Sequence, residues 1–311
     1  MTTQPFKDAQ AAFPFVIAQG RNIEAQVYSK RYPKYNYQDV VPVVTEGNQW
    51  AIGTTFFTID VAGQAKFLSG KGTDVPFVSS KRDQASHDFA MIGSGWEWTI
   101  EEVNQAALYN TNLQATDANT AAMAVDQLLY QIAMTGSDEK NWEGFVNSSL
   151  VSENDAAVTL AAATPGQAAG FVNDALSLVA TQTGEVEYAD TIAISPAIFR
   201  AWATKEYGEG NGTLNILSYI RQNNVYTAET GSPLNIVVSR ELTNAGGEGV
   251  DRMVAYRRDS EVLRFHLPMP RTVLAPRQTS LMGFEQGLIA RTGGTEIRLP
   301  GAMTYLDIDL A

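Results

Sequence analysis

The stretch that decides the fold closes the chain: Gly293-Gly294-Thr295-Glu296-Ile297-Arg298-Leu299-Pro300-Gly301-Ala302-Met303-Thr304-Tyr305. Its two glycines predict a turn between two strands, over residues 281–290 and 295–299. A second informative run, Asp60-Val61-Ala62-Gly63-Gln64-Ala65-Lys66-Phe67-Leu68-Ser69, belongs to a polar, two-sided β ribbon near the start. Neither run carries residues that do chemistry, and both are surfaces that need a partner. The combination indicates a protein that assembles with copies of itself.

The composition is that of a folded protein with a sizeable core. The 311 residues are 44% hydrophobic and 18% charged, which predicts one large domain or two ordinary ones. The absence of cysteine excludes disulfides and thiolate metal sites. The N-terminus has no basic flank followed by an apolar run, and no stretch approaches the roughly 18 apolar residues of a membrane span. We therefore expect no signal peptide, no membrane association and a cytoplasmic location.

The charge of the chain is negative and unevenly distributed. A net charge of −12 argues against DNA binding as the main task, because phosphate neutralisation needs clustered Lys and Arg. Residues 99–200 contain thirteen acidic and two basic side chains, whereas residues 252–298 contain eight arginines and four acidic side chains. These are either two solvated faces of one subunit or the two sides of a head-to-tail contact between copies. Arg271 and Arg277 are the candidates for the second alternative.

Residues 1–45 lack the pattern of a compact element. Aromatic side chains are spread through polar sequence, and four prolines interrupt any long periodicity. Such a segment cannot form a core of its own. We expect an extended arm whose aromatic side chains dock on another surface.

Residues 46–92 are rich in strand-forming residues. The run over 50–61 is dominated by β-branched and aromatic side chains, and residues 66–78 continue it. Two strands alone are marginally stable in water, so this ribbon must pack on its own subunit or lie across a neighbour. The residues alone favour neither alternative. The candidate contact residues of the ribbon are Trp50, Phe56, Phe57, Ile59, Lys66 and Phe67.

From residue 93 to 160 the pattern becomes helical. Thr99, followed by Glu101 and Glu102, is typical of a helix start. A longer helix with one apolar face is expected from about residue 116 to 134, with Gly136 as its stop.

Residues 161–265 alternate between helical and strand patterns, which predicts a mixed α/β domain. Residues 271–311 return to strand. In the α/β part we expect helices that begin at Thr164-Pro165, at Ser195-Pro196 and at Leu214, and short strands over 191–194, 236–238 and 253–256.

The search for a catalytic constellation finds only weak candidates. The two histidines, His87 and His266, lie far apart in sequence, and we expect neither to be a ligand or catalytic base. The loop Gly208-Glu209-Gly210-Asn211-Gly212 lacks the spacing and the preceding strand of a dinucleotide loop. We expect no enzymatic activity and no cofactor.

Three acidic clusters leave further readings open. Glu97, Glu101 and Glu102 lie close to Trp96 and Trp98, a combination found in glycoside hydrolases. The simpler reading of Glu101 and Glu102 is a helix start. The remaining clusters, Asp138-Glu139 and Glu153-Asn154-Asp155, lack the regular oxygen spacing of a calcium loop.

Five motifs in order resemble the major capsid proteins of tailed bacteriophages, which have the Hong Kong ninety-seven-type fold. They span nearly the whole chain. In the third motif, Gly144-Phe145 replaces the more usual Gly-Leu. The motifs are Asp60-Val61-Ala62-Gly63-Gln64-Ala65-Lys66 with Asp74-Val75-Pro76; Trp98-Thr99-Ile100-Glu101-Glu102; Gly136-Ser137-Asp138 with Gly144-Phe145-Val146-Asn147; Asp251-Arg252-Met253-Val254-Ala255-Tyr256; and the closing run over 293–305.

The resemblance implies an α+β fold with five parts. They are an N-terminal arm (1–45), an extended β-ribbon loop (46–92), a peripheral domain with a long spine helix (93–160), an axial α/β domain (161–265) and the return strands of the peripheral domain (266–311).

The resemblance also implies a function and a set of partners. The chain would be a structural protein that self-assembles as pentamers and hexamers into the icosahedral head of a tailed, double-stranded DNA bacteriophage. It would act in the virion after assembly in the host cytoplasm, with portal, scaffolding and decoration proteins as partners, and would enclose DNA without specific binding. The alternatives are a nanocompartment shell protein of the same fold and a carboxylate-based glycoside hydrolase.

Overall fold

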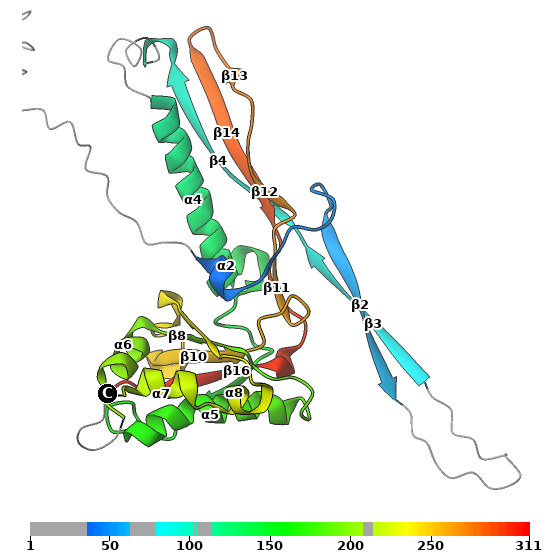
Figure 1. Cartoon of the computed structure of the whole chain (residues 1–311). Coiled ribbons are helices and arrows are strands. Elements are labelled where there is room, and N and C mark those ends of the chain that lie inside the picture. The colour runs from blue at the N-terminus through cyan, green and yellow to red at the C-terminus, as the bar shows by residue number, and fades with distance from the viewer. Residues whose placement is uncertain (1–35, 63–78, 103, 105–112, 208–213) are drawn as a thin grey trace, which may run out of the picture. The chain divides into compact units, whose positions relative to one another are not determined.

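The computed structural model describes residues 36–62, 79–102, 104, 113–207 and 214–311 (Figure 1). Within these residues the strands form one five-stranded, one four-stranded, one three-stranded and two two-stranded sheets, and helices lie between them in the sequence. The α+β class expected from the sequence is confirmed.

The five-stranded sheet lies at the centre of the molecule's packing. Its central strand, β10, is buried along its full length and is flanked by antiparallel β16 and β8. The edge strands β7 and β9 run parallel to β16 and β8. In spatial order the strands are β7 (Ser152–Asp155), β16 (Met303–Ile308), β10 (Asp251–Tyr256), β8 (Thr191–Ile194) and β9 (Asn235–Val238).

This sheet separates two hydrophobic cores. Successive residues of a strand point to opposite faces, so Val254 and Tyr256 enter one core whereas Met253 and Ala255 enter the other. The first core also contains side chains of α4 (Leu113–Thr135), and the second contains the buried faces of α5 (Pro165–Gln182), α6 (Pro196–Thr204) and α7 (Ile216–Gln222). Each face of β10 is therefore covered within one subunit.

The predicted helices of the α/β part are confirmed, together with their caps. Thr164 and Gln167 form a reciprocal capping box at the start of α5. Ser195 accepts a hydrogen bond from the backbone of Ile198 at the start of α6. The spine helix α4 ends before Gly136, whose φ of +80° is a conformation that favours glycine.

A four-stranded sheet lies beside α4 (Figure 1). Its two long strands, β4 (Ala90–Thr99) and β14 (Gly283–Thr292), are paired along all ten residues, and α4 packs against both. The expectation of helical structure from residue 93 is wrong, because β4 continues to Thr99. Every second residue of β4 faces α4, so Ile92 and Trp96 pack on the core. The edges are formed by β12 (Met269–Val273) and β13 (Arg277–Gln278).

The ribbon near the N-terminus consists of β2 (Gly53–Ala62) and β3 (Ser79–Asp88). The two strands are paired from Gly53 and Asp88 to Ala62 and Ser79, and no third strand joins them among the described residues. The first strand was predicted. The run over 66–78, expected to continue the ribbon, lies outside the described residues, and the second strand of the ribbon begins at Ser79.

The end of the predicted arm belongs to the body of the subunit. Tyr37 and Val40, in the short helix α2 (Tyr37–Val40), are buried in the first core, and the Tyr37 ring contacts Phe265 with centroids 5.1 Å apart. The short strand β1 (Val43–Val44) pairs in parallel with β11 (Leu263–His266), which also pairs with β15 (Gly294–Ile297). The predicted arm, residues 1–45, therefore ends too late in the sequence. Its last residues are buried in the core of their own subunit or paired with its strands.

The C-terminal return strands divide between two sheets. Strands β12 and β14 belong with the spine helix, as the resemblance implies, but β16 lies in the five-stranded sheet between β10 and β7.

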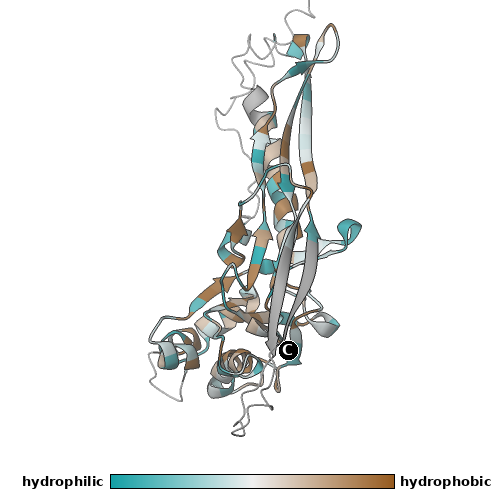
Figure 2. Cartoon of the chain, turned by 90° about the vertical axis from the view of Figure 1, so that its right-hand side faces the viewer, coloured by the Kyte–Doolittle hydropathy of each residue, from teal (hydrophilic) through white to brown (hydrophobic). Residues whose placement is uncertain are grey.

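Figure 2 shows hydrophilic and hydrophobic segments along the described elements. The remaining short elements are β5 (Gly136–Ser137), β6 (Trp142–Glu143), α8 (Val225–Thr230) and 3-10 turns at 138–140, 240–242, 247–249 and 300–302.

Candidate assembly surfaces

The ribbon joins the four-stranded sheet through a single residue. Strand β3 ends at Asp88 and β4 begins at Ala90, so Phe89 alone separates them. The Phe89 amide donates a hydrogen bond to the carbonyl oxygen of Ile52, 2.7 Å away, which ties the two strands of the ribbon together at its base. We call this region, with the turn at Gly293 and Gly294, the ribbon joint.

The glycine pair quoted first from the sequence forms the other side of the ribbon joint. A Cβ atom on Gly293 would lie 2.6 Å from Cδ1 of Phe89 and 3.1 Å from Cβ of His266. Gly294 has a φ of +77°, and a Cβ atom there would lie 3.2 Å from the Trp142 ring. Both positions therefore require glycine. At Gly293 the reason is the close approach of Phe89, and at Gly294 it is the positive φ as well as the nearby Trp142 ring.

The two histidines, which lie far apart in the sequence, meet in the ribbon joint. Their ring centroids are 5.5 Å apart, and the His87 ring also stacks on Trp142. Nε2 of His87 donates a hydrogen bond to the carbonyl oxygen of Gly293. Burial lowers the pKa of His87, and the neighbouring His266 adds to that effect. The strand pairing that brings these residues together has no local sequence signal.

His266 is buried and bound to a carboxylate. Its Nε2 atom lies 2.7 Å from Oε2 of Glu296, which also accepts a hydrogen bond from Nε of Arg298 at 3.1 Å. Burial acts to raise the pKa of Glu296, but the hydrogen bond and charge of His266, together with Arg298, hold it below its usual value. The second carboxylate oxygen, Oε1, is buried without a hydrogen-bond partner.

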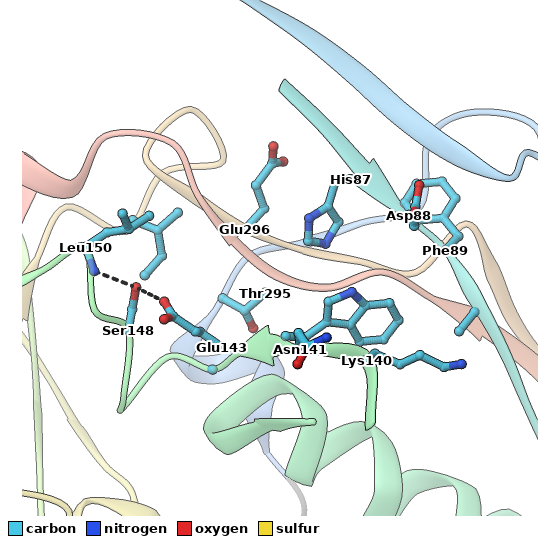
Figure 3. Close-up of a pocket in the computed structure, with 14 residues that line it drawn as sticks. His87, Asp88, Phe89, Lys140, Asn141, Glu143, Ser148, Leu150, Thr295 and Glu296 are labelled. Atoms are coloured by element: carbon cyan, nitrogen blue, oxygen red, sulfur yellow. Dashed lines mark hydrogen bonds between the residues drawn. The ribbon is translucent and has the colours of Figure 1, made fainter. Parts of the chain in front are cut away.

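A cavity of about 590 Å³ lies at the ribbon joint, and Figure 3 shows the side chains that line it. In that view Glu296 lies beside His87, and Phe89 lies on the other side of the histidine. The far wall is fixed by Glu143, whose carboxylate accepts hydrogen bonds from the hydroxyl groups of Ser148 and Ser149. The side chains that line the cavity include charged groups of both signs, among them Lys140 and Glu143.

The outer face of the four-stranded sheet is the second candidate surface. Glu97 of β4 lies directly opposite Glu285 of β14, and Arg277 of β13 lies opposite Glu285 on the other side. Like charges facing each other across strands destabilise a sheet, so this row is suited to contact with a cation. The neighbouring hollow, about 700 Å³, also includes the opposed glycines Gly95 and Gly287.

The geometry of this face does not favour the glycoside hydrolase alternative. Because residues alternate along β4, Trp96 and Trp98 face α4 whereas Glu97 faces outward. The Glu97 carboxylate and the two tryptophan side chains therefore leave β4 on opposite faces. Thr99 and Glu102 instead form a reciprocal cap, in which Oε2 of Glu102 accepts a hydrogen bond from the Thr99 amide at 2.8 Å.

The far end of the four-stranded sheet exposes apolar side chains. Leu281 is 92% exposed and Met282 is 57% exposed, in the turn before β14. Ile100, just after β4, is also exposed, and its amide donates a hydrogen bond to the carbonyl oxygen of Met282 at 2.8 Å. Clustered exposed apolar side chains of this kind mark contact surfaces. Sequence inspection missed this cluster, because separate apolar residues on a surface carry no signal until the fold brings them together.

The structure places the predicted ribbon contacts as follows. Trp50 is 61% exposed just before β2. Phe56, Phe57 and Ile59 occupy positions in β2, opposite Ala85, Gln84 and Arg82, but their side chains are outside the described part. Lys66 and Phe67 lie outside the described residues altogether. The glycine-rich loop considered in the sequence analysis, within residues 208–213, also lies outside the described residues.

The predicted arginine contacts differ from each other. Arg271 in β12 is exposed but already forms an ion pair with Asp126 of α4, with 2.7 Å between Nη1 and Oδ2. Arg277 is exposed on the outer face of the sheet, next to Glu285. Arg277 is therefore the better candidate for a contact with another copy.

The acidic middle and the Arg-rich third are in part complementary within one subunit. The buried Arg252 donates hydrogen bonds to Asp307 and to Glu153, and its guanidinium lies 4.4 Å from the centroid of the Tyr305 ring. Arg257, which is more exposed than Arg252, forms an ion pair with Glu187. Together with the pair of Asp126 and Arg271, they show that part of this charge is paired within one subunit and is not free for a contact between copies.

The described residues hold no group of three or more His, Asp or Glu side chains that could bind a metal ion. Glu153, in one of the acidic runs considered as a calcium loop, pairs with Arg252. No helix in the described part of the chain is long and apolar enough to cross a membrane.

Comparison with solved structures shows what the fold resembles. The capsid of Myoviridae Phage XM1 matches with a TM-score of 0.79 and 15% identity, over 94% of this chain and 97% of that one. The capsid of a native GTA particle matches with a TM-score of 0.66 and 10% identity, over 93% and 95%. A structure from Mycobacterium phage Adephagia matches with a TM-score of 0.60 and 14% identity, over 99% of both chains. The predicted phage capsid fold is confirmed.

No curated protein sequence matches the chain. The family model described as "Major capsid protein" does, over residues 63–308. This match covers most of the chain, including the spine helix, the four-stranded sheet and the five-stranded sheet. The chain belongs to the major capsid protein family, whose members form the shells of virions.

Proposed function

We propose that the chain builds the icosahedral head of a tailed, double-stranded DNA bacteriophage as pentamers and hexamers, and that assembly takes place in the cytoplasm of the host. Membership of the major capsid protein family supports the role of shell subunit. The observation that carries the detailed proposal is the ribbon of β2 and β3, ten residue pairs long without a third strand among the described residues. Two strands alone are marginal in water, so a neighbouring copy would supply the missing cover.

The outer face of the four-stranded sheet is the second proposed contact surface. It carries the row of Arg277, Glu285 and Glu97, and the apolar cluster of Ile100, Leu281 and Met282 lies at its end. Apolar contact would supply most of the association free energy, and the charged row would set register.

The proposed partners follow from the same role. Portal, scaffolding and decoration proteins would act with the shell, and DNA would be enclosed without specific binding. The net charge of −12 supports weak DNA contact, because few phosphates could be neutralised. Sub-micromolar binding of duplex DNA by unassembled subunits at physiological salt would contradict this part of the proposal.

The test shortens the ribbon without disturbing its base. Residues 56–85 are replaced by Asn-Gly, which connects Thr55 to Ser86, a directly paired couple, through a two-residue turn. The shortened subunit should keep the melting temperature of the body and should form no shells by electron microscopy. The control is the full-length chain with Thr55→Ser, which changes the base of the ribbon without shortening it and should assemble normally.

Two outcomes would contradict the proposal. If the shortened chain still forms shells, the ribbon is not needed between subunits. If the shortened chain unfolds, the ribbon belongs to the intramolecular core.

A further inference from the structure

Strand β4 is an edge strand of the four-stranded sheet. It is paired along ten residues with β14 on one side, and within the described part of the chain no strand pairs with its other side. Gly93 and Gly95 are exposed and have no side chains, so the backbone of β4 itself reaches solvent at these positions. A long row of free backbone N–H and C=O groups is a template for pairing with another strand.

The ladder with β14 decides which backbone groups of β4 point to the free edge. Thr99 lies opposite Gly283, and the amide of the next residue, Ile100, donates to the carbonyl oxygen of Met282. Hydrogen-bonded and non-hydrogen-bonded pairs alternate along an antiparallel ladder, so the even-numbered residues of β4 bond to β14 and the odd-numbered residues point away from it. The Thr99 amide fits this alternation, because it donates to the side chain of Glu102 instead. Among the described residues, no hydrogen bond uses the outward backbone groups of the other four odd-numbered residues, Met91, Gly93, Gly95 and Glu97.

This edge lacks the devices that usually prevent strands from pairing. Natural edge strands are protected by a lysine, a proline, a bulge or a very short length. Strand β4 has ten residues in uninterrupted register and contains neither lysine nor proline. Glu97 is its one charged residue. The edge is therefore open to a partner strand.

The helix that packs on β4 exposes apolar side chains on the same side. Asp126 of α4 forms an ion pair with Arg271 of β12, which lies beyond β14, so Asp126 is on the flank of α4 that faces away from the free edge. Ala124 and Leu128 are each two residues from Asp126, about 200° around the helix, and therefore lie on the flank toward the free edge. Both are exposed, Leu128 by 40%. A partner at this edge would cover them as well.

We propose that β4 pairs edge to edge with β4 of a second copy, antiparallel and centred on Ser94, so that two four-stranded sheets join into one. The contact is isologous, because both copies use the same edge. The inference rests on the proposed function only in requiring that copies of the chain assemble, and it goes beyond that function by assigning this edge a partner.

The register follows from the free backbone groups. With this centre, Gly93 faces the partner's Gly95 and Met91 faces the partner's Glu97, so all four residues exchange hydrogen bonds across the contact. The two Glu97 carboxylates do not face each other, which avoids a destabilising pair of like charges. A centre one residue later in β4 would require the Thr99 amide, whose hydrogen bond is already made.

The joined sheet would place the two α4 helices on the same face, side by side across the two-fold axis. The exposed Ala124 and Leu128 would then meet the partner's helix. On that face Ile92 lies opposite the partner's Trp96, an aromatic and β-branched pair of the kind that stabilises antiparallel sheets. A ribbon strand at this edge would bring no second helix and would leave Ala124 and Leu128 exposed.

A disulfide between the two Ser94 positions tests the pairing. Even-numbered residues form the non-hydrogen-bonded pairs of the proposed contact, in which Cα atoms are about 4.5 Å apart, within the range of disulfides. The chain has no cysteine, so Ser94→Cys introduces the only one. We expect Ser94→Cys shells, assembled under reducing conditions and then oxidised, to give a crosslinked pair on a non-reducing gel. The control is Val273→Cys, exposed on β12 at the opposite edge of the same sheet, which should remain a single chain.

Proline at the edge provides a second measurement. Gly95→Pro removes an N–H group that takes no part in the ladder with β14, so the unassembled subunit should keep its melting temperature. Gly95→Ala keeps that group and is the matched control, with a Cβ atom 3.4 Å from the carbonyl oxygen of Gln286. In the Ser94→Cys background and under assembly conditions, Gly95→Pro should lower the crosslinked fraction at least about tenfold, whereas Gly95→Ala should leave it nearly unchanged.

The outcomes separate this inference from the proposed function. Ser94→Cys shells that give no crosslinked pair, or no more than Val273→Cys shells do, would overturn the pairing and leave the role as shell subunit intact. Crosslinked pairs without shells would support the pairing and contradict the proposed function. A Gly95→Pro chain that crosslinks as well as Gly95→Ala would also overturn the pairing. If Gly95→Pro does not fold, the comparison of Ser94→Cys with Val273→Cys decides alone.

Discussion

The five-stranded sheet and the ribbon of β2 and β3 are both held by backbone hydrogen bonds between strands, but they differ in how far their own subunit covers them. Strand β10 is buried at all six positions, and its alternating side chains enter two cores that one subunit completes by itself. The ribbon has ten paired residues on each strand and, within the described residues, no neighbouring strand. The difference separates what holds the subunit together from what remains for another copy to cover.

The largest expected loss of stability follows from a substitution in the five-stranded sheet. Arg252 is buried and donates to both carboxylate oxygens of Asp307, which is also buried. Arg252→Ala leaves the carboxylate buried without its partner, so the free energy of unfolding should fall by about 3–5 kcal/mol. Urea unfolding of the unassembled subunit measures it. The exposed Lys140→Ala is the control and should change stability by less than about 0.5 kcal/mol. A loss below about 1 kcal/mol for Arg252→Ala would show that the five-stranded sheet does not depend on this pair.

A smaller effect is expected where the two regions meet. Gly293→Ala places a Cβ atom 2.6 Å from Phe89, and the ring must move to relieve the clash. We expect a loss of about 1–3 kcal/mol, confined to the ribbon joint and visible as faster hydrogen exchange at the Phe89 amide. Gly301→Ala is the matched control, because its Cβ atom would lie 3.6 Å from Thr183, an ordinary contact. Equal exchange in the two variants would mean that the glycine turn does not hold the ribbon.

The regions that could be predicted from the sequence are those whose structure is fixed locally. The caps at Thr164 and Ser195 and the apolar face of α4 all follow from residues three or four positions apart. The family motifs carried the assignment of the fold. Strand β4 was missed because Gly93 and Gly95 weaken its strand pattern, and the pairing with β14 that compensates for them is a long-range contact.

The candidate surfaces could be predicted only in part. The ribbon was found because its strand-forming residues are consecutive. The ribbon joint was missed because His87, Phe89, His266 and Gly293 come from distant segments, and each has an ordinary surrounding sequence. The pairing of Arg271 with Asp126 was missed for the same reason.

The smallest effect on stability is expected at the outer face of the four-stranded sheet. Arg277→Glu removes the positive charge from the row that contains Glu285 and Glu97. Because these groups are exposed, the free energy of unfolding should change by less than about 1 kcal/mol, while shell assembly, followed by light scattering, should slow. Arg271→Glu breaks the ion pair with Asp126 and is the matched comparison. If Arg271→Glu slows assembly more than Arg277→Glu does, the contact involves the edge at β12 instead.

Salt dependence sharpens the same comparison. Screening shortens the reach of charge interactions to about 3 Å at 1 M salt. Assembly of the wild-type chain should therefore slow as salt rises, and the Arg277→Glu variant should respond less. An identical salt response in both chains would remove Arg277 from the proposed contact.

Amide hydrogen exchange before and after assembly tests the central claim most directly, namely that another copy covers the ribbon while the five-stranded sheet is complete in one subunit. Exchange is compared between unassembled subunits and purified shells, with β10 and β16 as the internal reference. We predict that residues 53–62 and 79–88 become at least about tenfold more protected in shells, equivalent to about 1.4 kcal/mol, whereas the reference strands do not change. Equal protection of the ribbon in free subunits and in shells would contradict the account.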